Sequence, residues 1–236
     1  MIINVNRETF GGTIRNGDLI AVANIIEHLR KINNNPSMRF WIDPSARGTE
    51  GYCQEFYNFM LLTTDYFSDF QGTETLPWKK VNIWDFRDIC GDLVSIPNSA
   101  EMKKKIVIFP LTDAPYNTYR NWPEQLLPQL IEKYSSEEYN DYEKIICAKN
   151  IRGVTKKEWK VSSSMSENLV HIMESEIFIG GDTGTTHFAF ALAKPPQDLL
   201  YYGSSRALLH TLPFYLLQGK GRMYNYWLDF EGSSWV

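Results

Sequence analysis

The segment from Gly180 to His187 combines residue types that bind phosphate. Its sequence, GGDTGTTH, mixes glycines with hydroxyl side chains, one carboxylate and one imidazole. An apolar run, IFI, precedes it and a small-residue apolar stretch follows it. This order predicts a buried strand, a tight turn and the N-terminus of a helix. Because the first N–H groups of a helix lack intrahelical partners and lie at the positive end of its dipole, a diphosphate fits such a turn.

The residues of this turn suit different kinds of contact with a ligand. The glycines at 180, 181 and 184 let the backbone approach a bound group closely, while Thr183, Thr185 and Thr186 offer capping oxygens and hydroxyl donors. His187 falls in the first turn of the helix, beside any bound anion. A capped helix after a buried strand, without a ligand, is the alternative interpretation, because short glycine patterns occur there as well.

A second polar loop lies near the N-terminus of the sequence. Gly12 belongs to a flexible turn, and Gly17-Asp18 opens a stretch in which apolar residues recur at helical spacing up to Ile32. The free N–H groups of a helix start favour a carboxylate. Taken alone, Asp18 is therefore explained as a capping residue.

A third loop, 110–122, follows the strongly apolar run IVIF and contains Thr118 and Arg120. The guanidinium of Arg120 can bind a phosphate in bidentate geometry. A surface ion pair is the alternative, since exposed arginines commonly form one.

Alternating strands and helices must position these three loops. We expect strands at 1–5, 38–42, 80–84, 93–96, 106–109, 144–148, 177–179 and 198–202, and helices at 19–32, 51–67, 123–134, 164–174 and 186–193. The alternation predicts an α/β fold with mainly parallel sheets. A composition change at Pro97-Asn98-Ser99 divides it into two Rossmann-like lobes, 1–100 and 101–236, with ligands at the carboxyl ends of strands.

Composition narrows the class of protein. The 236 residues carry a net charge of −4, so bulk attraction to nucleic acid is not evident, although lysines cluster at 79–80, 103–105 and 156–157. The three cysteines show no spacing typical of a zinc site or a disulfide framework. No stretch approaches the roughly 20 apolar residues of a membrane span, and the first residues lack a signal-peptide core. We expect a cytoplasmic protein.

Taken together and in order, the three loops resemble the heptosyltransferase family of glycosyltransferases, the ADP-heptose:lipopolysaccharide transferases. That family carries a GD pair before an apolar helix, then a strand with a Pro-containing loop, a basic residue and Trp-Pro, and finally the signature N/D-D-S/T-G-x-x-H-x-A-x-A-L-x-x-P. The matching segments here are Gly17-Asp18-Leu19-Ile20, Ile106–Pro110 with Arg120-Asn121-Trp122-Pro123, Gly181–Pro195 and Tyr202-Gly203-Ser204. The chain is roughly 100 residues shorter than a typical member, and the Pro that follows the GD helix start is missing.

The resemblance implies a GT-B-like fold, in which an N-terminal lobe (1–100) binds the acceptor and a C-terminal lobe (101–236) binds a nucleotide-sugar donor across a central cleft. It makes Asp18 the general base, within an acceptor loop that includes Gly12 and Gly17. The donor-binding residues it implies are Thr118, Arg120, Asp182, Thr183, Gly184, Thr185 and His187, and Asp182 either holds hydroxyls of the sugar or caps the helix. Since no DxD pair lies near the turn, we expect neither a bridging metal nor another cofactor.

These inferences predict a metal-independent transfer of a hexosyl, heptosyl or pentosyl group to an acceptor hydroxyl. Two acceptors remain open. One is a surface glycan of the lipopolysaccharide type, which the resemblance implies. The other is a hydroxymethylated base, or its sugar, in bacteriophage DNA within the host cytoplasm, since the richness in Tyr, Phe, Trp and Asn is typical of a low-GC phage genome. A non-catalytic module that binds a nucleotide sugar is the alternative from another class.

Overall fold

Parallel strands alternate with helices in both halves of the chain. The computed structural model describes residues 1–10, 12–75, 94–110, 126–147, 157–181, 183–202 and 222–224. Contacts divide the chain into two compact units, Met1–Pro97 with Ala191–Ala193, and Asn98–Phe190 with Lys194–Val236. The predicted α/β class with parallel sheets is confirmed. The lobes 1–100 and 101–236 and the GT-B arrangement across a cleft stay predictions, as does the expected strand at 80–84, which lies outside the described residues.

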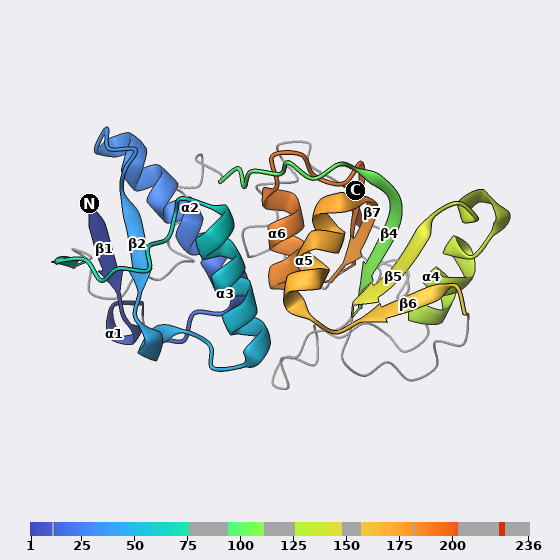
Figure 1. The fold of residues 1–236 in the computed structure, drawn as a ribbon, viewed down its shortest axis with the longest axis horizontal. Coiled ribbons are helices and arrows are strands. Elements are labelled where there is room, and N and C mark those ends of the chain that lie inside the picture. The colour runs from blue at the N-terminus through green and yellow to red at the C-terminus, as the bar shows by residue number, and fades with distance from the viewer. Residues whose placement is uncertain are drawn as a thin grey trace. The chain divides into compact units, whose positions relative to one another are not determined.

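The first unit is built on a parallel sheet with the order β2-β1-β3. Apolar residues at helical spacing along α2 are buried, as the sequence predicts, and α2 and α3 lie side by side (Figure 1). Helix α3 ends at Thr63, earlier than the expected residue 67. The elements are β1 (Ile2–Val5), α1 (Arg7–Phe10), α2 (Asn16–Ile32), β2 (Arg39–Ile42), the 3₁₀ turn η1 (Pro44–Ala46), α3 (Gly51–Thr63) and β3 (Glu74–Thr75).

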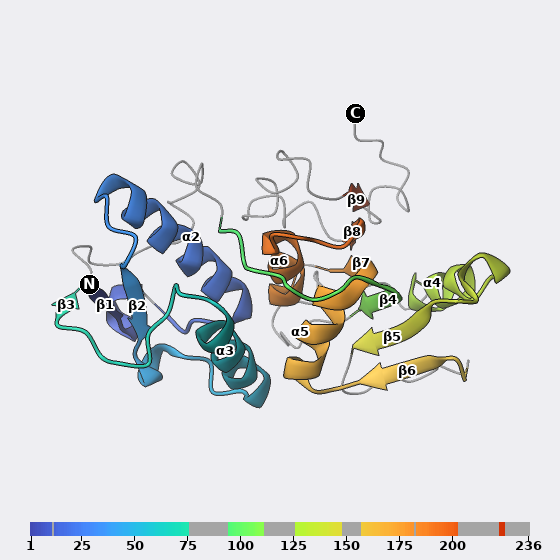
Figure 2. The ribbon, with the colours of Figure 1, turned by 45° about the horizontal axis from the view of Figure 1, so that its top comes forward.

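The second unit contains a sheet of parallel strands in the order β6-β5-β4-β7-β8-β9, which Figure 2 shows as a ladder from β6 to β9. Numbered from its own first strand, this is the order 3-2-1-4-5-6 of a doubly wound dinucleotide-binding sheet. The elements are β4 (Lys103–Phe109), α4 (Leu126–Tyr134), η4 (Glu137–Tyr139), β5 (Glu143–Cys147), β6 (Trp159–Ser162), α5 (Met165–Glu174), β7 (Ser175–Gly180), α6 (Gly184–Ala191), β8 (Asp198–Tyr202) and β9 (Arg222–Tyr224).

Successive side chains of β4 point to opposite faces of this sheet. Ile106 and Ile108 pack with Leu130 and Ile131 of α4 in one apolar cluster. Lys105 points to the other face, where it contacts α5. The sheet is therefore covered on both faces, as parallel sheets generally are.

Candidate functional site

The point at which the strand order reverses lies between β4 and β7. These strands are direct neighbours, and Phe109 pairs with Gly180 at their carboxyl ends. From β4 the strand order runs outward to β5 and β6, whereas from β7 it runs the other way to β8 and β9. In open α/β sheets such a reversal leaves a crevice at the carboxyl ends, where ligands bind. The predicted phosphate turn begins there, because its first residue, Gly180, is the last residue of β7.

Backbone hydrogen bonds define how helix α6 begins. The N–H groups of Thr186 and His187 donate to the carbonyl oxygen of Thr183, at 3.1 and 3.2 Å. The N–H of Thr183 itself donates to Gly181 O at 2.8 Å. Thr183 is thus the capping residue, and the N–H groups of Gly184 and Thr185 occupy the first two helical positions, where helix geometry supplies no partner. Those two donors suit an anion.

The threonine hydroxyls of the turn bind one another. Thr183 Oγ1 lies 2.8 Å from Thr185 Oγ1 and 3.2 Å from Thr186 Oγ1, and it accepts a longer bond of 3.4 Å from the Thr186 N–H. The side chains of Thr185 and Thr186 are buried, whereas Thr183 and Gly184 are half-buried. The exposed surface of the turn therefore comes from Thr183 and Gly184, and the inner hydroxyls hold its shape.

Gly180 allows the first turn of α6 to pack against the end of β7. A Cβ atom at this position would collide with Thr186 Oγ1 and would lie 2.7 Å from the Phe178 ring. Thr186 is fully buried. Its hydroxyl was expected to cap the helix or to donate to a ligand, whereas its packing against Gly180 was not predicted.

The other predicted donor residues divide into two groups. His187 is buried, at 7 % exposure, in the first turn of α6. Thr118, Arg120 and Asp182 lie outside the described residues. The structure therefore brings together Thr183, Gly184, Thr185 and His187 in one turn, and the roles of all these residues stay predictions.

Asp18 lies in the first turn of α2, in the first unit. Its Oδ2 accepts a hydrogen bond of 2.9 Å from the backbone N–H of Arg15, the residue that precedes the helix. The carboxylate therefore caps the helix start, as the sequence allowed. Gly12, in the loop before α2, and Gly17, in the first turn of α2, are both half-buried. A Cβ at Gly12 would meet nothing within 4 Å, so packing does not require glycine there.

Main-chain bonds fasten this loop to the segment after β2. Ile14 N–H donates to Ala46 O at 2.7 Å, and Gly48 N–H donates to Ile14 O at 3.0 Å. On the exposed side, Arg15 Nη2 lies 3.3 Å from Glu50 Oε1. The start of α2 is thus held mainly by backbone bonds.

The described part of the chain contains no cluster of metal ligands and no helix suited to a membrane span. There, no group of three or more His, Cys, Asp and Glu side chains could hold a metal ion. No described helix is long and apolar enough to cross a membrane. The expectation of metal-independent chemistry stays a prediction.

Comparisons with known proteins give a distant likeness in architecture. No protein-family model matches the sequence, and curated proteins give no significant match. E. coli heptosyltransferase WaaC with ADP is similar at 10% identity and a TM-score of 0.46, over 87% of this chain and 88% of that one. E. coli ADP-heptose lps heptosyltransferase II is similar at 12% identity and a TM-score of 0.48, over 95% and 90%. Identities and TM-scores this low do not assign a function to this chain.

Proposed function

We propose that the chain is a glycosyltransferase that moves a sugar from a nucleotide-diphosphate donor to an acceptor hydroxyl. One observation carries the proposal. The Gly180–His187 turn begins at the carboxyl end of β7, beside β4, where the strand order of the parallel sheet reverses. The order of the three sequence blocks, which resembles that of heptosyltransferases, supports a sugar nucleotide as the ligand.

The turn would stabilise the leaving diphosphate. Negative charge develops on this group as its bond to the sugar breaks, and preorganised N–H donors stabilise such charge. The N–H groups of Gly184 and Thr185 and the half-buried Thr183 are the described donors. By resemblance, Arg120 supplies fixed positive charge, Thr118 and His187 add contacts and Asp182 holds the sugar. Helix dipole and guanidinium would together make a bridging metal unnecessary.

Asp18 would act as the general base. As the acceptor oxygen bonds to the anomeric carbon, its proton would pass to the Asp18 carboxylate and the electron pair of the breaking bond would leave with the diphosphate. The Arg15 N–H bond to Oδ2 fixes the carboxylate at the start of α2, an arrangement compatible both with this role and with a capping role alone. A positioned base gains rate from that fixed orientation.

Calorimetric titration with ADP, UDP, GDP and CMP tests the donor site. We expect one nucleotide to bind the wild-type chain and to bind the Gly184→Val variant at least about tenfold more weakly, because the side chain fills the space above the N–H groups. Ser175→Ala is the matched control, since this buried hydroxyl lies at the other end of β7 and bonds Ile172 O at 2.9 Å. Absence of binding by every nucleotide would refute the proposal.

Transfer of a labelled sugar distinguishes the two classes of acceptor. A lipid A-core glycan and hydroxymethylcytosine DNA without glucose are offered separately to the same enzyme and donor. We propose the glycan as the first acceptor, since net acidity does not favour a DNA substrate. Incorporation into DNA alone would reverse this choice.

A module that binds a nucleotide sugar without transferring it is the second candidate. The capping bond between Arg15 N–H and Asp18 Oδ2 favours it, because a structural role then suffices for the carboxylate. If Asp18→Asn left donor turnover unchanged while Gly184→Val abolished donor binding, this second function would be supported and the base assignment would be wrong.

A further inference from the structure

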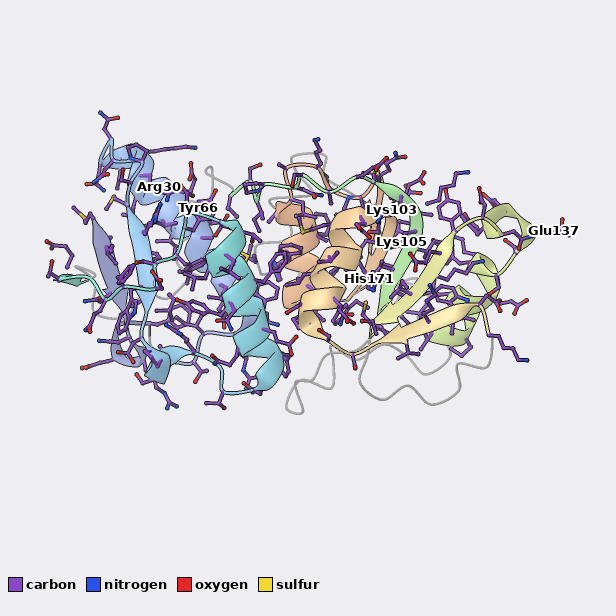
Figure 3. All side chains as sticks on the ribbon, viewed as in Figure 1. Arg30, Tyr66, Lys103, Lys105, Glu137 and His171 are labelled. Carbon is purple, nitrogen blue, oxygen red and sulfur yellow. The ribbon has the colours of Figure 1, made fainter. Side chains whose placement is uncertain are left out.

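A buried lysine lies at the amino-terminal side of the second sheet, away from the turn. Lys105 of β4 is 2 % exposed. Its Nζ lies 2.5 Å from Glu174 Oε2, 3.3 Å from Glu143 Oε2 and 3.2 Å from His171 Nδ1. Figure 3 shows Lys103 and Lys105 on β4 and His171 on α5. Strands β4 and β5 and the last turn of α5 therefore meet at one ammonium group.

The contact with His171 defines the state of its imidazole. An ammonium group has three N–H donors and no acceptor, so Nδ1 of His171 must accept the hydrogen bond from Lys105. The ring is then neutral and carries its proton on Nε2. A protonated ring donates from both nitrogens, so it cannot accept this bond, and it would place a second positive charge beside the buried ammonium.

Charged groups from four elements surround this contact. Glu174 on α5 pairs with both Lys103 and Lys105 of β4, and Glu143 on β5 pairs with both Lys105 and Lys160 of β6. Glu167 lies one helical turn before His171. Glu143 and Glu174 thus bring two negative charges against the three positive charges of Lys103, Lys105 and Lys160, so they leave no excess negative charge for a protonated ring.

The balance of these groups favours the neutral ring. Burial lowers the pKa of His171 and Lys105 lowers it further, against the attraction of Glu143, Glu174 and Glu167. Beside His171 there is space for its imidazole ring to take a different position. An open groove of about 680 Å³ is lined by Lys160, Ser162, Ser166, Glu167 and His171, among others.

We propose that His171 is a proton-sensitive latch that fastens the C-terminal end of α5 to strands β4 and β5. At neutral pH the ring accepts from Lys105 and the latch is closed. On protonation the ring leaves Lys105 and turns into the groove toward Glu167, and the last turn of α5 loosens. Because β7 begins at Ser175, directly after α5, the release reaches the strand that carries the turn at its other end. This inference is independent of the proposed enzymatic function.

Nitrogen-15 NMR of the full chain, labelled at histidine, tests the closed state. We expect the His171 resonances of the neutral Nε2–H tautomer at about pH 7.5 and a titration midpoint below 6.5, the ordinary value. An Nδ1–H tautomer, or a midpoint above 6.5, would overturn the proposal.

Hydrogen exchange between about pH 7 and pH 5.5 tests the release. In the wild-type chain, protection factors of amides 171–176 should fall with pH, up to about tenfold for each pH unit by which the midpoint lies below 6.5. His171→Gln should abolish this fall, because its amide oxygen can accept from Lys105 without titrating. Val170→Ala, an exposed neighbour on α5, is the control and should keep it. An equal fall in His171→Gln would refute the latch.

Discussion

The turn after β7 and the loop between α1 and α2 both lead into a helix, but they are held in different ways. The buried hydroxyls of Thr185 and Thr186 both bind the half-buried Thr183 hydroxyl and hold the turn, and they leave backbone N–H groups at its exposed side. The loop is held by main-chain bonds to a neighbouring segment and by one carboxylate, Asp18, which caps the helix. The turn is therefore shaped at least in part by threonine hydroxyls and backbone bonds, whereas the loop uses the carboxylate that the proposed reaction also needs.

Asp18→Asn should produce the largest effect and should separate capping from catalysis. The amide oxygen can still accept from the Arg15 N–H, so the free energy of unfolding should fall by less than about 1 kcal/mol. It cannot take a proton, so kcat for sugar transfer should fall about 100- to 10,000-fold. Steady-state kinetics and urea unfolding measure the two quantities.

Asp43→Asn is the matched control for this variant. Asp43 is also a carboxylate at a strand end of the first unit, and it accepts from Ser45 N at 2.7 Å. Its hydrogen bonds with Ser45 hold the pKa of Asp43 below the ordinary value. We expect unchanged kcat in Asp43→Asn. Loss of stability without loss of kcat in Asp18→Asn would leave Asp18 with the capping role alone.

Gly180→Ala should have the second-largest effect, because it should lower both the stability of the chain and its affinity for nucleotide. The added methyl group collides with the Thr186 hydroxyl and the Phe178 ring, both of which are fully buried. Overpacking of this kind destabilises by about 1–3 kcal/mol, and displacement of the first turn of α6 should weaken nucleotide binding as well. Thermal unfolding and calorimetry provide the measurements.

Gly51→Ala supplies the comparison for that substitution. A Cβ at Gly51 meets nothing within 4 Å, and the residue begins helix α3. We expect unchanged or slightly raised stability there, since Ala has the higher helix propensity. Equal effects at the two glycines would mean that the packing of Thr186 on Gly180 does not hold the turn.

The sequence predicted the features that depend on local pattern. The helical spacing of Leu19, Val22 and Ile26 predicted α2, and the apolar run IVIF predicted a strand that the structure extends back to Lys103. Strand β6 was missed. Its four residues, WKVS, show no clear apolar pattern, because a strand at the edge of the sheet can expose Val161. Such a strand is defined by its partner β5, which a local pattern does not contain.

Burial of a charged residue was also beyond the sequence pattern. A run of lysines such as Lys103–Lys105 is typical of a solvated strand flank, and Lys104 is exposed. Lys105 is buried because Glu143 and Glu174, distant along the chain, converge on it. The same distinction, between features that local residue types predict and contacts that only the fold creates, applies to the candidate site. The turn and its capping threonine could be predicted from residue types, whereas the contact of Thr186 with Gly180 required the folded chain.

Thr186→Val should have an intermediate effect on the turn. Valine keeps the shape of the side chain but removes the hydroxyl that lies 3.2 Å from Thr183 Oγ1. We expect a loss of about 1–2 kcal/mol in unfolding free energy, since a buried hydrogen bond is lost, and a severalfold weaker nucleotide affinity. Thr186→Ser, which restores the hydroxyl, should recover affinity. If serine and valine bound nucleotide equally well, the hydroxyl network would not position the N–H groups.

Glu50→Gln should have the smallest effect and should show what holds the first-unit loop. Arg15 and Glu50 are 3.3 Å apart, with side chains 45% and 36% exposed, and exposed pairs of this kind contribute at most about 1 kcal/mol. Because Ile14 bonds Ala46 and Gly48 through the main chain, the loop should keep its place, and kcat should stay within about twofold of wild type. A double-mutant cycle with Arg15→Gln, measured in low and high salt, gives the pair's own contribution. A coupling above about 2 kcal/mol, or a tenfold loss of kcat, would show that the ion pair, rather than the backbone, positions Asp18.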